Sequence, residues 1–167
     1  GGIGSGMYCL EGTGAISHMS VRHTMEFFHE PDLFAAVCVQ GETPEKNIAR
    51  VVEGPIPDWK FFGAARTGNG APGKTYGLPR FRECEFSARF PFCTVKLNDK
   101  AVPVSAKITG FSPFTPGDAE SSSLPVGSLE YTFKNESDNA IEAVFYLNTR
   151  NFMGDGPVGE IDNGFVF

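Results

Sequence analysis

The stretch "RECEFSARF", Arg82–Phe90, shows the alternation that decides the fold class. Apolar side chains fall on one face and polar side chains on the other, which is the period of two expected of a half-buried β-strand. The apolar set is Cys84, Phe86, Ala88 and Phe90, and the polar set is Glu83, Glu85, Ser87 and Arg89. The alternation shifts near Pro91 before "CTVKL" continues it, so we expect a bulge or break at the proline.

The same alternation recurs downstream and predicts two hairpins. Asn98–Lys100 has the composition of a turn, and the strand after it completes the first hairpin. "SLEYTFK" and "AIEAVFYLN", separated by the turn "NESDN", form the second hairpin. The predicted inward residues are Val102, Val104, Ala106, Ile108, Leu129, Tyr131, Phe133, Ile141, Ala143, Phe145 and Leu147. Two hairpins joined by the long Pro- and Ser-rich connection 111–127 are typical of a sandwich of antiparallel sheets.

The N-terminal half and the composition agree with this fold class. Short strands are predicted in "MYCLEG", "DLFAAVCVQG" and "IARVVEG", whereas "SHMSVRHTMEFFHE", residues 17–30, fits either a helix or a strand. The chain has 167 residues with 20 Gly, 12 Pro and 16 Phe, so many turns separate short aromatic-rich runs. We therefore predict one all-β domain, a complete or partial antiparallel β-sandwich with few or no helices, spanning residues 1–167.

Charge and hydropathy indicate which classes of partner the sequence does not predict. The formal net charge is −6 and Lys and Arg are not clustered, so nucleic acid is not a predicted partner. No apolar run reaches the roughly 18 residues of a membrane-spanning helix, and the compartment is left open between cytoplasm and a periplasmic or secreted location. The chain opens on "GGIGSG" without Met and closes on "NGFVF" in a predicted strand, so we expect it to be part of a larger protein.

The segment "GNGAPGKT", Gly68–Thr75, matches the phosphate-binding pattern G-x-x-x-x-G-K-[ST]. A working loop of this kind follows a buried strand and opens a helix, whose N-terminal amides hold the phosphates. Here Pro79 falls where the first helical turns should be, and Pro72 removes an amide donor from the loop itself. We therefore predict a surface loop, with no nucleotide and no other cofactor bound.

The other potentially reactive side chains are predicted to have structural roles. Four cysteines, at positions 9, 38, 84 and 93, lack the close pairs of a zinc site. An even count allows two disulfides in three possible pairings, but the apolar surroundings favour buried free thiols. The histidines do not follow the H-E-x-x-H pattern, so no metal site is predicted from His18, His23 and His29 with Glu26 and Glu30. Glu83 and Glu85 share a strand face, where a solvated surface with cross-strand basic partners is far commoner than a catalytic pair.

The region from Ile108 onward carries a family resemblance. "ITGFSPFTPGDAESSSLPVGSLEYTFKNESD" and the later "NTRN", residues 148–151, resemble the N-terminal domain of glycoside hydrolase family 116. That family includes β-glucosidases and the non-lysosomal glucosylceramidase, also called bile-acid β-glucosidase. The opening Gly1–Gly4 is similar to the Gly-Gly-Ile-Gly of its members, and so are Asp118, the segment Ser122–Val126, and the pair Arg150 and Asn151.

The resemblance implies a β-sandwich that packs on a separate catalytic (α/α)-barrel domain. It also implies that an Asp and a Glu of the barrel do the retaining, two-carboxylate chemistry, so no catalytic residue is assigned within this chain. We expect the loops "GGIGSG" (residues 1–6) and "SSSLPVG" (residues 121–127) to border the substrate cleft. The candidate cleft or domain-interface residues are Gly2, Gly4, Asp118, Ser122, Ser123, Arg150, Asn151, Trp59 and Tyr76.

An independent carbohydrate-binding module is the alternative function. Modules of this class present aromatic side chains to the faces of sugar rings. Trp59, Phe61, Phe62 and Tyr76 flank the glycine-rich segment and are the residues from which the sequence offers such a platform. Under either hypothesis the small-molecule partner is a carbohydrate or glucoside, and only the first requires a catalytic barrel of the same parent chain.

Overall fold

The computed structural model describes residues 6–21, 33–58, 60, 77–149, 151 and 156–166. These residues form antiparallel sheets with short helical segments between them, which confirms the predicted all-β class. The strands are β1 (Met7–Leu10), β2 (Ile16–Ser20), β3 (Phe34–Val39), β4 (Ile48–Val51), β5 (Glu83–Arg89), β6 (Phe92–Asn98), β7 (Val104–Phe111), β8 (Ser128–Asn135), β9 (Ala143–Asn148), β10 (Gly159–Ile161) and β11 (Gly164–Val166). The helical segments η1 (Pro44–Lys46) and α2 (Ala119–Ser122) are one turn long.

The larger sheet has four strands in the order β5-β6-β7-β8, each antiparallel to its neighbour. The break predicted near Pro91 is present, but it is a chain reversal rather than a bulge. β5 ends at Arg89, β6 begins at Phe92, and the two strands pair in register on either side of the turn. β7 and β8 also pair directly, so the long connection 112–127 joins neighbouring strands and does not cross between sheets.

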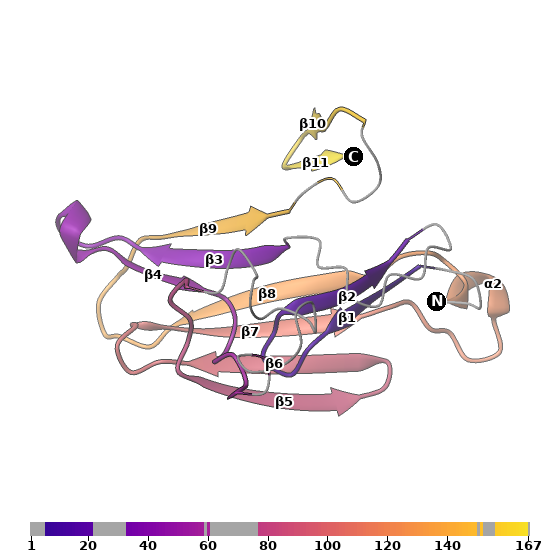
Figure 1. Ribbon diagram of the computed structural model, residues 1–167, viewed down its shortest axis with the longest axis horizontal. Helices are drawn as coiled ribbons and strands as arrows, with labels where there is room; N and C mark the ends of the chain where they lie inside the picture. Colours follow the sequence, from indigo (N-terminus) through magenta and orange to yellow (C-terminus); the bar gives the residue numbers. More distant parts are fainter. Residues whose placement is uncertain are drawn as a thin grey trace.

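The second layer consists of the three-stranded sheet β4-β3-β9 and the hairpin β1–β2 (Figure 1). The predicted hairpin of β8 with β9 is wrong, because β9 pairs with β3 instead and the chain crosses to the other sheet after β8. Residues 17–20 of the stretch that fitted helix or strand belong to β2, and residues 22–32 lie outside the described part. β10 and β11 form a separate short hairpin near the C-terminus.

The core lies between the two layers, on the faces that the alternation predicted for β7 and β8. Other side chains that were predicted to face inward are exposed, namely Cys84, Phe86, Ala88, Phe90, Ala143, Phe145 and Leu147. Val37 of β3 packs in the core with Val95 and Leu97 of β6 and Ile108 of β7, all at most 2% exposed. The inner residues of β8 are partly buried against the same cluster. Burial of branched aliphatic side chains stabilises such a core by about 1.5–3 kcal/mol for each side chain.

Apart from Phe92 and Phe111 at one end, whose ring centroids lie 5.5 Å apart, the outer face of the four-stranded sheet is polar. Its side chains include Glu85 of β5, Lys96 of β6, Lys107 of β7 and Glu130 of β8. A one-residue slip would bury these charges, which fixes the register of the sheet. No helix among the described residues is long and apolar enough to cross a membrane.

Candidate functional site

One end of the four-stranded sheet gathers the connections that the sequence singled out. The turn 90–91 links β5 to β6 at this end, and the connection 112–127 links β7 to β8 there. The start of β1 reaches the same place, because Tyr8 contacts Gly127 and Ser128. We call these three parts together, including Met7 and Tyr8, the loop end. Figure 1 shows α2 within it, beyond the ends of β7 and β8.

Tyr8 holds the start of β1 against the end of the connection 112–127. Its hydroxyl donates a hydrogen bond of 3.3 Å to the carbonyl oxygen of Ser128. Its ring lies so close to Gly127 that a Cβ atom at that position would overlap it. Burial, and secondarily the charge of the Cys93 thiolate, raise the pKa of the Tyr8 phenol, so it stays a neutral donor. The strand that follows the Gly1–Gly6 segment is thus held against the last residue of the "SSSLPVG" loop.

Asp118 begins α2 as its N-cap. Its carboxylate accepts hydrogen bonds from the Ser121 backbone N–H at 3.0 Å and the Ser121 hydroxyl at 2.6 Å. These bonds lower the pKa of Asp118, so the group is an ionised acceptor suited to capping and unsuited to donating a proton. Of the predicted residues, Asp118, Ser122 and Ser123 therefore lie together in the loop end.

The serines of α2 are also engaged within the loop end. The Ser122 hydroxyl accepts from the Thr115 N–H at 2.9 Å and donates to the Thr115 carbonyl at 3.1 Å. The Ser123 hydroxyl donates to the Ala119 carbonyl at 2.6 Å. These bonds fold the connection back on itself, so that it presents a defined surface and not a set of unpaired polar groups.

The loop end carries several exposed apolar side chains, which sequence reasoning missed. Phe90 is 77% exposed and meets Phe114 edge to face, with ring centroids 4.8 Å apart. The exposed large apolar residues of this end are Met7, Phe90, Phe92, Phe114, Leu124 and Val126. The signal that could have found them is a Phe beside a Pro in a predicted turn, as in "FPF" and "SPF", where no strand face explains a bulky apolar side chain.

Of the other predicted site residues, the structure describes only Asn151. Asn151 follows β9, and its side-chain amide donates to the Gly156 carbonyl at 3.0 Å. Gly2, Gly4, Trp59, Tyr76 and Arg150 lie outside the described residues. The same holds for the phosphate-loop pattern Gly68–Thr75 and for Phe61, Phe62, His23, Glu26, His29 and Glu30.

Two buried ion pairs, also missed by sequence reasoning, flank the segment 61–79. Lys60 pairs with Glu11 of the β1–β2 connection, and Arg80 pairs with Glu53 at 3.0 Å. Burial raises the pKa of Glu53 and the Glu11 charge adds to the effect, although Arg80 and Lys60 oppose both. Charges that are this well shielded persist only when they are paired. The pairs tie three separate chain segments to one another.

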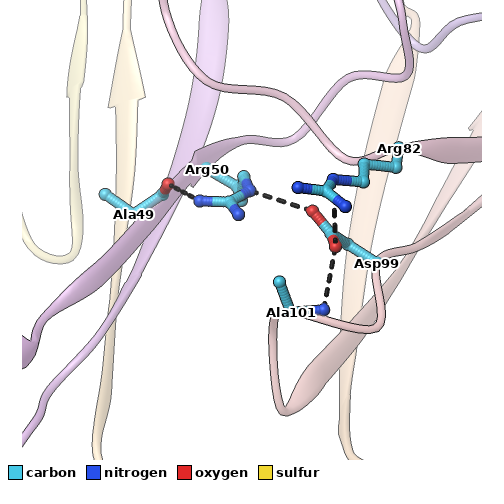
Figure 2. Close-up of polar contacts among 5 residues, drawn as sticks. All are labelled: Ala49, Arg50, Arg82, Asp99 and Ala101. Atoms are coloured by element: carbon cyan, nitrogen blue, oxygen red, sulfur yellow. Dashed lines mark hydrogen bonds and ion pairs between the residues drawn. The ribbon is translucent and has the colours of Figure 1, made fainter.

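A third polar cluster lies at the turn between β6 and β7 (Figure 2). The Asp99 carboxylate accepts from Arg50 Nε at 3.1 Å and from the Ala101 N–H at 2.9 Å, and Arg82 Nε lies 3.9 Å away. Burial opposes ionisation of Asp99, but these hydrogen bonds and charges outweigh it and lower its pKa. Because the carboxylate is fully enclosed by structural partners, this cluster joins β4 to the β6–β7 turn and offers no reacting group.

The remaining candidates have the structural roles that the sequence favoured. Glu85 pairs across the strands with Lys96 at 3.6 Å on the solvated face, as expected for a surface carboxylate. All four cysteines are free, but none is fully buried as predicted, because Cys84 is exposed and Cys9, Cys38 and Cys93 are half-buried. Among the described residues no group of three His, Cys, Asp or Glu side chains is placed to hold a metal ion.

A comparison with protein families shows to which family the chain belongs. The family model for beta-glucosidase 2, the N-terminal domain of glycosyl-hydrolase family 116, matches residues 1–164. The chain belongs to this family. A search of curated proteins found no match. The loop end, the buried ion pairs and the β-sandwich are thus features of a family 116 N-terminal domain, and the resemblance seen after Ile108 extends over nearly the whole chain.

Proposed function

We propose that this family 116 domain supports a catalytic (α/α)-barrel domain of the same hydrolase, and that its loop end borders the cleft in which a β-glucoside binds. The observation that carries the proposal is the gathering of exposed apolar side chains at one end of the sandwich. Isolated exposed apolar residues are ordinary, but a contiguous group marks a surface that another molecule or domain covers. The family relationship supplies the candidate for that partner.

The polar groups of the loop end support a positioning role. Asp118 is ionised and occupied by Ser121, and the hydroxyls of Ser122 and Ser123 are bonded to their own segment. A capped turn of this kind holds a rim in place, whereas retaining hydrolysis needs a raised-pKa acid facing a nucleophile about 5–5.5 Å away. The chemistry is therefore assigned to the barrel, and this chain contributes shape at the edge of the cleft.

The test uses the full-length hydrolase and a matched pair of valines. Val126 in the loop end and Val158 before β10 are both 55% exposed, so Val126→Ser and Val158→Ser remove equal apolar surface at different places. We expect Val126→Ser, and more strongly Val126→Ser with Phe114→Ser, to lower the thermal midpoint of the enzyme and raise KM for an aryl β-glucoside. Equal effects of the two valine substitutions, or unchanged kinetics in the loop-end variants, would contradict the proposal.

The carbohydrate-binding alternative has one favourable observation, which is the exposed ring of Phe90. Aromatic rings bind sugars by stacking on their apolar faces, and a ring that is 77% exposed is accessible for this. Calorimetry with the 167-residue chain and gluco-oligosaccharides separates the two functions. Binding that Phe90→Ala abolishes would favour the module, whereas no binding, together with the kinetic effects above, supports the proposed role.

A further inference from the structure

The turn between β10 and β11 carries an asparagine that is followed directly by a glycine. Its two residues, Asp162 and Asn163, connect Ile161 to Gly164, which stand opposite each other in the hairpin. Asn163 has φ +61°, the only positive φ of a residue other than glycine in the described part of the chain. Asparagine adopts this left-handed conformation more readily than most residues. Asn163 and Gly164 are both exposed, so water has access to the turn.

The side-chain amide of Asn163 is not held by any hydrogen bond to the described residues. Asn135 shows the contrast, because its amide donates to the Asn139 carbonyl at 2.7 Å and accepts from the Ser137 hydroxyl at 2.7 Å. Of the asparagines that the structure describes, Asn163 alone precedes a glycine. A glycine has no side chain that blocks the approach to its own backbone nitrogen, and its backbone rotates freely.

The hairpin that contains this turn is short and opens at a small free-energy cost. β10 and β11 have three residues each, and in the described part of the chain they pair only with each other. Figure 1 shows the hairpin set apart from the larger sheets. Val158, Ile161 and Val166 are 55%, 58% and 53% exposed, so apolar burial contributes little to the pairing. A two-stranded hairpin with so little burial opens locally, which frees the Gly164 nitrogen from the ladder.

We propose that Asn163–Gly164 is a self-modification site, at which the asparagine deamidates to isoaspartate and the β10–β11 hairpin thereby loses its pairing. The backbone nitrogen of Gly164 loses its proton to a base in the solvent and attacks Asn163 Cγ. The new N–C bond closes a cyclic imide, the Cγ–Nδ2 bond breaks, and Nδ2 leaves as ammonia after taking up a proton. Water then opens the ring at the main-chain carbonyl of residue 163, which leaves a free carboxylate there.

The isoaspartate product does not fit the two-residue turn. Its main chain runs through the former side chain, so the turn gains one backbone carbon atom. The pairing of Ile161 with Gly164 depends on the length and conformation of the turn, and the added atom removes that match. The new carboxylate also lies beside Asp162 and repels it.

Peptide mapping of the full-length hydrolase after incubation at mildly alkaline pH measures the conversion. We expect the peptide that contains Asn163 to change from amide to acid, and the product to be methylated by an isoaspartate methyltransferase. Asn139, which is also exposed but precedes Ala140, is the internal control and should convert at least about tenfold more slowly. The other Asn-Gly pair, Asn69–Gly70, lies outside the described residues and is scored in its own peptide. Equal rates at Asn163 and Asn139 would overturn the proposal.

Gly164→Ala tests the role of the attacking nitrogen. The φ of Gly164 is not positive and a Cβ there would lie 3.6 Å from Ile161, so the substitution leaves the hairpin intact. The added methyl group hinders the attack and should slow the conversion of Asn163 about tenfold. Undiminished conversion in this variant would contradict the mechanism.

Hydrogen exchange before and after the incubation tests the effect on the hairpin. We expect the converted wild-type protein to lose the protection of the backbone amides in β10 and β11. Asn163→Gly, which accepts the positive φ and has no amide to lose, should keep its protection through the same incubation. Retained protection in the converted wild type would overturn the proposed loss of pairing.

Discussion

Arg80 and Glu53 form an ion pair that is almost completely shielded from water. The Arg80 Nε lies 3.0 Å from Glu53 Oε2, and the two side chains are 8% and 4% exposed. The pair joins the segment after β4 to the segment before β5, next to the isolated bridge between Val51 and Arg80. Because the pKa of Glu53 is nevertheless raised, burial disfavours its ionised form more than the arginine favours it. Stability should therefore depend on pH through this group.

We predict that Glu53→Gln gains stability relative to the wild type as pH rises. A raised folded-state pKa means that the folded protein holds the proton more tightly than the unfolded chain, whose Glu pKa is about 4.3. The contribution of Glu53 is thus fully present below about pH 4.3 and is lost as pH rises through the raised value. Urea unfolding of both proteins across this window gives the difference. A difference that is constant with pH would show that Glu53 has an ordinary pKa.

The titration of the Tyr131 phenol should depend on the charge of Glu53. Burial, followed by the charges of Glu53 and Tyr8, raises the pKa of its phenol to about 12. We expect Tyr131→Phe to remove the highest step from an ultraviolet titration of the tyrosines. Glu53→Gln should move that step to lower pH, because it removes the negative charge that disfavours the phenolate. Tyr146→Phe, which alters an exposed phenol, is the control and should leave the step in place.

Asp99→Ala should destabilise the fold by about 2–4 kcal/mol, because it leaves Arg50 and the Ala101 N–H without their shared acceptor. Glu42→Ala removes an exposed i,i+4 pair with Lys46 and should cost no more than about 0.5 kcal/mol. Because folding lowers the pKa of Asp99, its contribution to stability depends on pH. The stabilisation is present above about pH 3.9 and is lost as pH falls through the folded-state pKa. Urea midpoints at neutral and acidic pH check both statements, and equal losses for the two variants would contradict them.

Two glycines with positive φ provide a matched test of packing. Gly14 has φ +91° and a Cβ there would lie 2.7 Å from Ile108 Cδ1, whereas Gly117 has φ +80° and open space around it. Gly117→Ala should therefore cost only the conformational term, about 1–2 kcal/mol. Gly14→Ala adds overpacking of the core, for a total of about 2–4 kcal/mol. Chemical denaturation of the two variants measures both losses of stability. Equal losses would mean that the Ile108 side chain moves aside without cost.

The faces of the strands could be read from the sequence, but their partners could not. Alternation is a local property, so the inner residues of β7 and β8 were predicted correctly from a period of two, whereas the side chains predicted to face inward on β5 are exposed. Which strands pair depends on contacts between distant segments, such as Val37 of β3 opposite Phe145 of β9. Hairpin reasoning favours the nearest partner and therefore assigned β9 to β8. The chain crosses to the other sheet because the inner face of β9 must cover Tyr131 and Phe133.

The candidate site was predicted only in part, and only through the family resemblance. Asp118, Ser122 and Ser123 were expected from the matching segment, and the structure shows that Asp118 caps α2 through a short-range contact with Ser121. The hydrogen bond from Tyr8 to Ser128 joins residues 120 positions apart, and the Glu53–Arg80 pair joins segments separated by an undescribed stretch. No local pattern encodes such contacts. Phe90 and Phe114 left a weak signal, since each is a bulky apolar residue next to a proline in a turn.

The contact between Tyr8 and Gly127 can be tested by a double-mutant cycle. A Cβ at Gly127 would overlap the Tyr8 ring, so Gly127→Ala should destabilise the domain by about 1–3 kcal/mol. In a Tyr8→Ala background the obstacle is gone, and the same substitution should cost less than about 0.5 kcal/mol, which gives a coupling energy above about 0.5 kcal/mol. Additive losses would mean that β1 does not lie against the connection 112–127. Gly77→Ala, with nothing within 4 Å, is the control in both backgrounds.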